Sequence, residues 1–233
     1  ANGQFVSSSV GTSSTFTVTV SRHGQFMYGD DGTAKAIIIG NPDGTPFNIM
    51  GVNKWLGVEL SKTRITAQFG TYGKDTPLPN PSIVSNKLDA YSTDHNNRGN
   101  NVSPQTTDQQ MNEAWVQETG NSKSNSDTWM TYEGTTDSQG ISGVPAVRHC
   151  RSIIVDGKPM DCPSQHALMR VYKLREFIDA NDPTANSYPA NKLTTSWGSG
   201  TNVIWSSTEN SSSSVFSVGY DGYADGSYSK GSA

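Results

Sequence analysis

The chain has 233 residues, a net charge of −4 and a hydrophobic fraction of only 33%; charged residues make up 16%. Gly, Ser, Thr, Asn and Asp fill the difference, which is typical of a β-dominated protein with many loops and excludes a helical bundle. The scattered basic residues argue against nucleic acid as a partner, and no apolar run approaches the ~20 residues of a membrane span. Five Trp and nine Tyr indicate a packed core rather than a disordered chain.

Residues 1–45 are predicted to form an N-terminal β-arm for assembly, ahead of a main domain over residues 46–233. Strands are predicted at residues 16–20, 25–28 and 36–39, with turns at residues 30–32 and 41–44. An arm this rich in Ser and Thr is expected to be held by a neighbouring subunit. The first residues do not resemble a signal peptide, and Ala1 is compatible with a removed initiator Met or with a cleaved signal.

The middle of the chain is predicted to hold long loops around one helix. Residues 76–105 are rich in Pro, Asn, Asp and Ser, and so long a loop in a compact domain either has a function or packs on a partner. A capping box that begins at Thr107 predicts a helix that ends by Gly120. Residues 121–145 are polar and are expected to form a second loop, anchored by Trp129 and Tyr132.

Two cysteines, Cys150 and Cys162, flank a predicted β-hairpin. Asp156-Gly157 lies between extended residues, a pattern typical of a tight hairpin turn. The turn would bring the two sulfurs close together, so a disulfide is possible and would contribute roughly 3 kcal/mol; two buried thiols are the alternative. His149 and His166 lie near the cysteines, but their spacing matches no zinc-finger pattern, so no metal site is expected there.

The last third of the chain is predicted as helix, loop, strand and hairpin. Ser164 can cap a helix over residues 165–179, whose apolar side chains form one stripe, and Asp182-Pro183 would end it. A loop is predicted over residues 184–200, a strand over 202–207 and a β-hairpin over 215–228.

This last third resembles the C-terminal half of C-type-lectin-like domains of bacterial surface proteins and phage tail proteins. The resemblance covers about residues 145–233 and rests on Pro163-Ser164 before the helix and on Trp205-Ser206-Ser207-Thr208-Glu209 before the terminal hairpin. It implies an α+β fold with two helices, short and mostly antiparallel strands, and long loops. Residues 1–105 do not align with the family.

Tyrosines set among Gly, Ser and Asp make the terminal hairpin the predicted ligand-binding surface. This composition is typical of antibody contact surfaces, in which stiff aromatic rings lie beside adaptable hydrogen-bonding groups. In phage proteins that resemble this one, the same end of the fold contacts the ligand. Trp205 is expected in the core, and a loop position predicts an exposed Trp197. The predicted ligand-binding residues are Trp197, Tyr220, Asp221, Tyr223, Asp225 and Tyr228.

Known catalytic and metal-binding motifs find no counterpart in this chain. Animal lectins of this fold bind calcium and sugar through Glu-Pro-Asn or Gln-Pro-Asp and Trp-Asn-Asp triplets, whereas Asn41-Pro42-Asp43 lies in an N-terminal turn and Trp205 precedes Ser. No nucleophile elbow, phosphate loop or His-Glu-x-x-His motif occurs. We therefore expect no catalytic residue, metal or cofactor. A pair of glycosidase carboxylates is the remaining alternative, because the fold can bring two such residues together from positions that are distant in sequence.

These observations lead to the hypothesis of a non-enzymatic phage virion protein, on tail or capsid, that binds a host-surface saccharide or protein without calcium. A homotrimer that contacts other virion subunits is expected by analogy with such proteins. The alternative is a capsid decoration protein that uses residues 76–105 and 121–145 as interfaces. A third hypothesis is a secreted bacterial surface adhesin, which an intact Cys150–Cys162 disulfide would favour.

Overall fold

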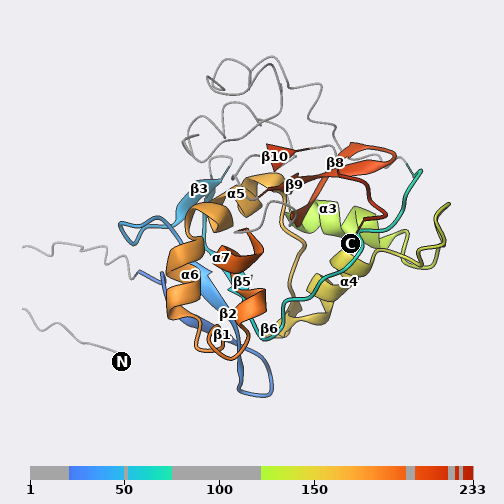
Figure 1. The fold of residues 1–233 in the computed structure, drawn as a ribbon. Helices are drawn as coiled ribbons and strands as arrows, with labels where there is room; N and C mark the ends of the chain where they lie inside the picture. Colours follow the sequence, from blue (N-terminus) through green and yellow to red (C-terminus); the bar gives the residue numbers. More distant parts are fainter. Residues whose placement is uncertain are drawn as a thin grey trace, which may run out of the picture.

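The fold combines short helices with small antiparallel sheets. The computed structural model describes residues 21–49, 52–74, 122–197, 203–219, 224–225 and 228–232. Within these ranges the chain forms five α-helices and four antiparallel sheets of two or three strands (Figure 1), which confirms the α+β class. The strand predicted at 16–20, the loop at 76–105 and the helix at 107–120 lie outside the described residues.

The first sheet has the order β1-β2-β5. Its strands are β1 (Phe26–Tyr28), β2 (Ala34–Ile39) and β5 (Leu56–Glu59), and the hairpin of β3 (Phe47–Ile49) and β4 (Val52–Lys54) lies between β2 and β5 in sequence. The two strands predicted within residues 25–39 are therefore confirmed. Residues Ala36–Ile39 of central β2 pair with Leu56–Glu59 of β5, so strands from both sides of the predicted boundary after residue 45 share one sheet.

Two helices lie within residues 122–152, and the first of them falls inside the loop predicted over 121–145. They are α3 (Ser122–Met130) and α4 (Pro145–Ser152). The prediction of a loop over 121–145 is wrong for α3, whose sequence is polar and carries little helical signal of its own. Tertiary contacts hold it: Trp129 is fully buried, and its indole Nε1 donates to the carbonyl of Ser207 at 2.8 Å. Trp129 thus acts as the predicted anchor, but from a helix.

The helix predicted over 165–179 is divided into α5 (Gln165–Lys173) and α6 (Arg175–Asn181). Ser164 caps α5 as predicted, because its hydroxyl accepts the amide of Ala167. The break falls at Leu174, whose ψ of 11° leaves the helical region, and Asp182 caps the end of α6. The loop predicted over 184–200 contains the 3₁₀ helix η2 (Pro189–Asn191) and the short α7 (Leu193–Ser196).

The last three strands of the described chain form a second antiparallel sheet with the order β10-β9-β8. Its strands are β8 (Ile204–Ser211), β9 (Ser214–Val218) and β10 (Ala224–Asp225). The predicted hairpin within 215–228 is confirmed by the antiparallel pairing of β9 with β10. The strand predicted over 202–207 continues to Ser211 and forms a further hairpin with β9. We call this three-stranded unit the terminal sheet.

The hairpin predicted between the two cysteines is present. It consists of β6 (Ile154–Val155) and β7 (Lys158–Pro159). Asp156 and Gly157 both have positive φ, at 49° and 69°, as a two-residue turn of the I′ type requires. The hairpin contacts the first sheet, since the amide of Asp156 donates to the carbonyl of Tyr28 at 3.3 Å.

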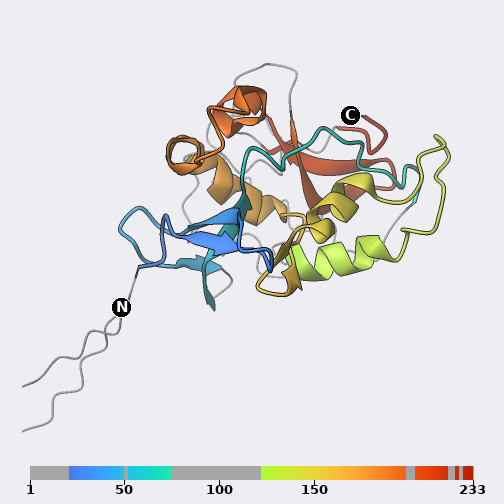
Figure 2. The same cartoon turned by 90° about the horizontal axis from the view of Figure 1, so that it is seen from below.

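Two apolar clusters form the core of the described part of the chain. The larger cluster joins β2 and β5 to α5, α6 and α7, and α5 also contacts β8 and β9 of the terminal sheet (Figures 1 and 2). The smaller cluster lies under the terminal sheet, where Phe69 packs edge-on against Trp129 with 4.9 Å between ring centroids. Both clusters are small, which fits the low hydrophobic fraction of the sequence.

A buried ion pair joins the last residues of the chain to the terminal sheet. The ammonium of Lys230, fully buried, lies 2.7 Å from the carboxylate of Glu209, which is itself 3% exposed. The other two ammonium donors bond the carbonyls of Lys74 at 2.8 Å and Ser212 at 3.1 Å, and the ring of Trp129 lies 4.8 Å away. Every proton of the ammonium therefore has an acceptor, which offsets much of the desolvation cost.

We expect Lys230→Met to destabilise the fold by about 3–5 kcal/mol, because it leaves the Glu209 carboxylate buried without its partner. The double variant Lys230→Met/Glu209→Met should recover much of that loss, since no charge then remains. Urea unfolding gives both free energies. Lys123→Met is the control, because Lys123 and Asp127 form an exposed pair and its loss should cost less than about 1 kcal/mol. Equal effects of the two lysine substitutions would contradict the assignment.

Candidate functional site

Trp197 does not lie at the surface. It is 2% exposed, its indole Nε1 donates to the carbonyl of Val218 at 2.9 Å, and its ring meets Tyr172 edge-on at 5.0 Å. The prediction of an exposed Trp197 is therefore wrong. The short helix α7 directs the ring into the larger core cluster, and this helix carries almost no local sequence signal.

Trp205 and Tyr228 pack against each other at the edge of the smaller core cluster. Both are half-buried, and their ring centroids lie 6.5 Å apart. The Trp205 indole donates to the carbonyl of Ala67 at 2.9 Å and meets Phe69 edge-on. The expected core position of Trp205 is thus met in part. Tyr228, predicted as a ligand-binding residue, packs its ring against Trp205 and is only half-buried.

The connection between β9 and β10 starts and ends at paired positions of one sheet. Val218 of β9 pairs with Ala224 of β10, so that residues 219–223 join two neighbouring strand ends. Tyr220, Asp221 and Tyr223 lie outside the described residues, as does the side chain of Asp225. The structure therefore fixes the two anchor points of this predicted ligand-binding segment.

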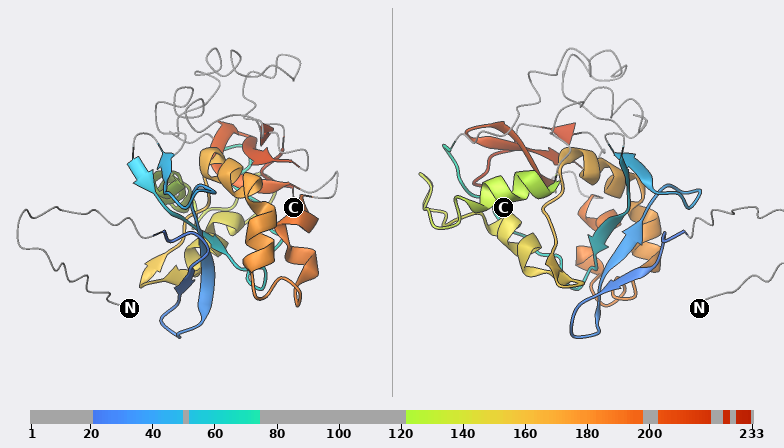
Figure 3. Two further views of the ribbon diagram at one scale, coloured as in Figure 1. Left: turned by 90° about the vertical axis from the view of Figure 1, so that its left-hand side faces the viewer. Right: turned by 180° about the vertical axis from the view of Figure 1, so that it is seen from behind.

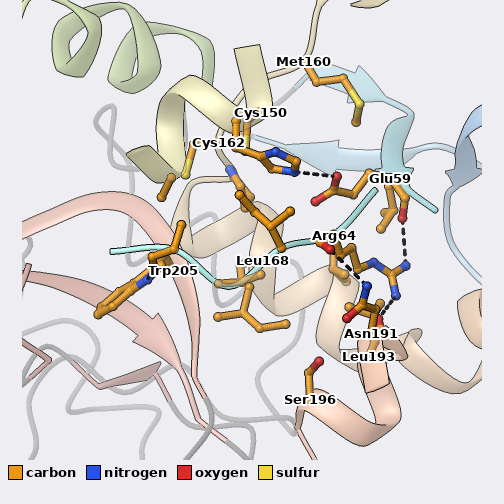
Figure 4. A pocket seen from close by; sticks show the side chains of 18 of the residues that line it. Glu59, Arg64, Cys150, Met160, Cys162, Leu168, Asn191, Leu193, Ser196 and Trp205 are labelled. Atoms are coloured by element: carbon orange, nitrogen blue, oxygen red, sulfur yellow. Dashed lines mark hydrogen bonds and ion pairs between the residues drawn. The ribbon is translucent and has the colours of Figure 1, made fainter. Parts of the chain in front are cut away.

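A cavity of about 340 Å³ lies among β5, α4, α5, α7 and the start of β8 (Figure 4). Most of its lining is apolar, with Val58, Leu168, Val171, Leu193, Trp197 and Ile204 among the lining residues. Its polar lining includes Glu59, Arg64, His149, Asp161 and Asn191, and both cysteines and Met160 add sulfur. We call this space the central cavity.

Glu59 and His149 form an ion pair at the wall of the central cavity. The imidazole Nε2 lies 3.1 Å from the Glu59 carboxylate, and the two side chains are 18% and 22% exposed. The hydrogen bond to Glu59 raises the pKa of His149, against the opposing effect of burial, and the backbone carbonyl of Thr63 also favours the charged ring. Sequence reasoning missed this pair, because its members lie on β5 and α4, ninety residues apart, with no local motif.

Arg64 fixes a second wall of the central cavity. Its guanidinium donates to the carbonyls of Glu59 and Asn191, each at 2.8 Å. Asp179 lies 3.6 Å and Asp182 4.0 Å away. Burial lowers the pKa of Arg64, while the surrounding carboxylates oppose that shift. Arg64 thus ties the chain after β5 to η2 and α6, and its charge is already compensated.

Cys150 and Cys162 are close to each other but are free thiols. The fully buried Cys162 thiol shares a hydrogen bond with Cys150, and this bond together with burial raises its pKa well above the ordinary range. The expected proximity of the sulfurs is therefore present, whereas the disulfide is not formed in this structure. Cys150 lies in the last turn of α4 rather than on a hairpin strand. The α4 helix, as well as the turn, therefore sets the distance between the sulfurs.

Within the described ranges, no group of three or more His, Cys, Asp or Glu side chains is arranged to hold a metal ion. None of the helices described there is long and apolar enough to cross a membrane. Comparison with protein-family models, with curated proteins and with solved structures finds no match for this chain. The role of each site is therefore inferred from the chemistry of its own residues.

We expect the pKa of His149 to lie above its ordinary value of about 6.5 and to fall in the Glu59→Gln variant, because the variant loses the carboxylate that favours the charged ring. Titration of the histidine ring signals by NMR measures this directly. His23 is an internal control: its pKa is lowered by burial and should not change in the variant.

The same pair makes stability depend on pH. Since folding raises the pKa of His149, its contribution is fully present below about pH 6.5 and is lost as the pH rises through the raised folded value. The difference in unfolding free energy between the native chain and Glu59→Gln should therefore shrink above that value. A difference that grows with pH would contradict the assignment.

Proposed function

We propose that this chain is a non-enzymatic virion surface protein that binds a host-surface receptor through the β9–β10 end of its terminal sheet. The observation that carries the proposal is the pairing of Val218 with Ala224, which holds both ends of a connection composed of Gly, Tyr and Asp. A short aromatic segment held at both ends loses little conformational entropy when it binds a partner.

The terminal sheet is suited to present such a segment because its base is rigid. All five residues of β9 are buried, and the Lys230–Glu209 pair anchors β8 to the last residues of the chain. A bridge between Ser214 and Ser229 adds these residues to the edge of β9. Binding residues on a rigid scaffold are held in place more accurately than residues on a free loop.

A C-type-lectin-like arrangement is part of this proposal, and two features support it. Ser164, in the Pro-Ser motif of the resemblance, caps α5. The Trp-Ser-Ser-Thr-Glu motif runs along β8, and its Glu209 is the buried partner of Lys230. The motifs of the resemblance thus lie at positions where they stabilise the fold. A homotrimer is also proposed by analogy. It would present several copies of a weak binding site, whose combined binding to one cell surface is stronger than that of a single site.

Binding of the purified, fluorescently labelled chain to candidate bacterial cells tests the proposal. We expect saturable binding that is unchanged by EDTA, because the proposed contacts are aromatic and polar side chains rather than a bound calcium ion. Binding that EDTA abolishes would overturn the calcium-independent part. Retention on virus particles that lack this protein, without binding to any cell, would instead favour a capsid decoration protein.

We expect Tyr220→Ala and Tyr223→Ala each to weaken cell binding about tenfold or more, as loss of an aromatic hot spot does, without lowering the free energy of unfolding. Tyr28→Ala is the matched control: Tyr28 is 50% exposed, and its strand β1 lies at the opposite end of the fold from β10 (Figures 1 and 3). Unchanged binding in both tyrosine variants would show that the terminal connection is not the binding site.

A further inference from the structure

We propose that the central cavity binds one neutral, mainly apolar small molecule that donates a hydrogen bond to Glu59. This site is separate from the receptor surface proposed above, and the inference does not depend on that function. It rests on the size of the cavity, on its apolar walls, and on the way in which the charged groups around it are already paired.

The size of the cavity suits a bicyclic molecule. Its volume of about 340 Å³ is more than twice the ~150 Å³ of an apolar cavity that takes up benzene, and it lies within the range of ~300–1,000 Å³ that is typical of ligand pockets. Lining residues Leu168, Leu193 and Trp197 are each 3% exposed or less. A ligand would therefore contact a buried apolar wall on this side, which favours an apolar body.

Glu59 provides the polar end of the site. One carboxylate oxygen, Oε2, is held by His149 at 3.1 Å, whereas Oε1 has no hydrogen-bond partner within the described part of the chain. Figure 4 shows Glu59 and Leu168 among the side chains that line the cavity. A carboxylate oxygen of this kind accepts a hydrogen bond and donates none. A ligand that carries an N–H or O–H group is therefore favoured over one without a donor.

The paired charges around the cavity favour a neutral ligand. His149 is neutralised by Glu59, Asp161 lies 3.0 Å from Arg151, and Arg64 faces two aspartates outside the cavity lining. A charged ligand would lose its hydration without gaining a free counter-ion, which costs several kcal/mol. Each cation that lines the cavity is already held by a carboxylate of the chain.

The cavity also has an accessible rim. Ile65, among its lining residues, is 58% exposed, and Thr66 and Ala190 beside it are exposed as well. The exposed Ile65 side chain therefore places apolar surface where the lining of the cavity meets solvent. Neither β10 nor the described residues after it contribute to the lining.

Titration calorimetry with three matched probes tests the inference: indole, 1-methylindole, which lacks the N–H donor, and indole-3-carboxylate, which carries a charge. We expect saturable 1:1 binding of indole, with binding of 1-methylindole at least about fivefold weaker and of indole-3-carboxylate at least about tenfold weaker. No saturable binding of indole, or equal binding of all three probes, would overturn the proposal.

Two variants locate the binding in the central cavity. Ala146→Leu fills part of the cavity from α4 and should weaken indole binding about tenfold, whereas Ala180→Leu, at an exposed position of α6 outside the lining, should leave it unchanged. Glu59→Met should abolish the preference for indole over 1-methylindole and serves as the second variant if Ala146→Leu does not fold. Indole binding that survives both cavity variants with its preference intact would place the site elsewhere and overturn the proposal.

Discussion

The Lys230–Glu209 pair is the interaction on which the second half of this fold depends. A buried lysine is costly unless each of its protons has an acceptor, and here a carboxylate and two backbone carbonyls supply all three. The pair joins the last residues to β8, to the segment that follows β5, and to the ring of Trp129 on α3. Segments that are distant in sequence are thereby fixed around one charge.

Arg64 has a similar role where the first sheet meets the helices near residues 175–191. It holds η2 and α6 near the end of β5, and Asp179, one of its partners, also accepts the amides of Leu193 and Thr194 and so caps α7. A chain with few hydrophobic residues has limited core to specify its fold. Its long connections are instead positioned by buried ionic and hydrogen-bonded clusters, which tolerate few alternative arrangements because an unmatched charge is costly.

Trp197 links the interior of the molecule to the proposed binding surface. Its ring lines the central cavity, and its indole holds the carbonyl of Val218, the last residue of β9 before the connection to β10. Trp197 therefore connects the lining of the central cavity to the end of β9. A buried aromatic residue in this position serves packing and positioning, which explains why Trp197 is inside although its neighbours in sequence are small and polar.

Local signals in the sequence determined the elements that depend on a few neighbouring residues. The strands β1 and β2, the Asp156-Gly157 turn and the Ser164 cap were all predictable, because turn conformation, alternation and capping act over two to four positions. The same reasoning failed for the polar helix α3, for the buried Trp197, and for the pairs Glu59–His149 and Lys230–Glu209. Their partners lie from about twenty to about ninety residues away, so burial and pairing were decided only when packing brought distant segments together and each buried polar group required a partner.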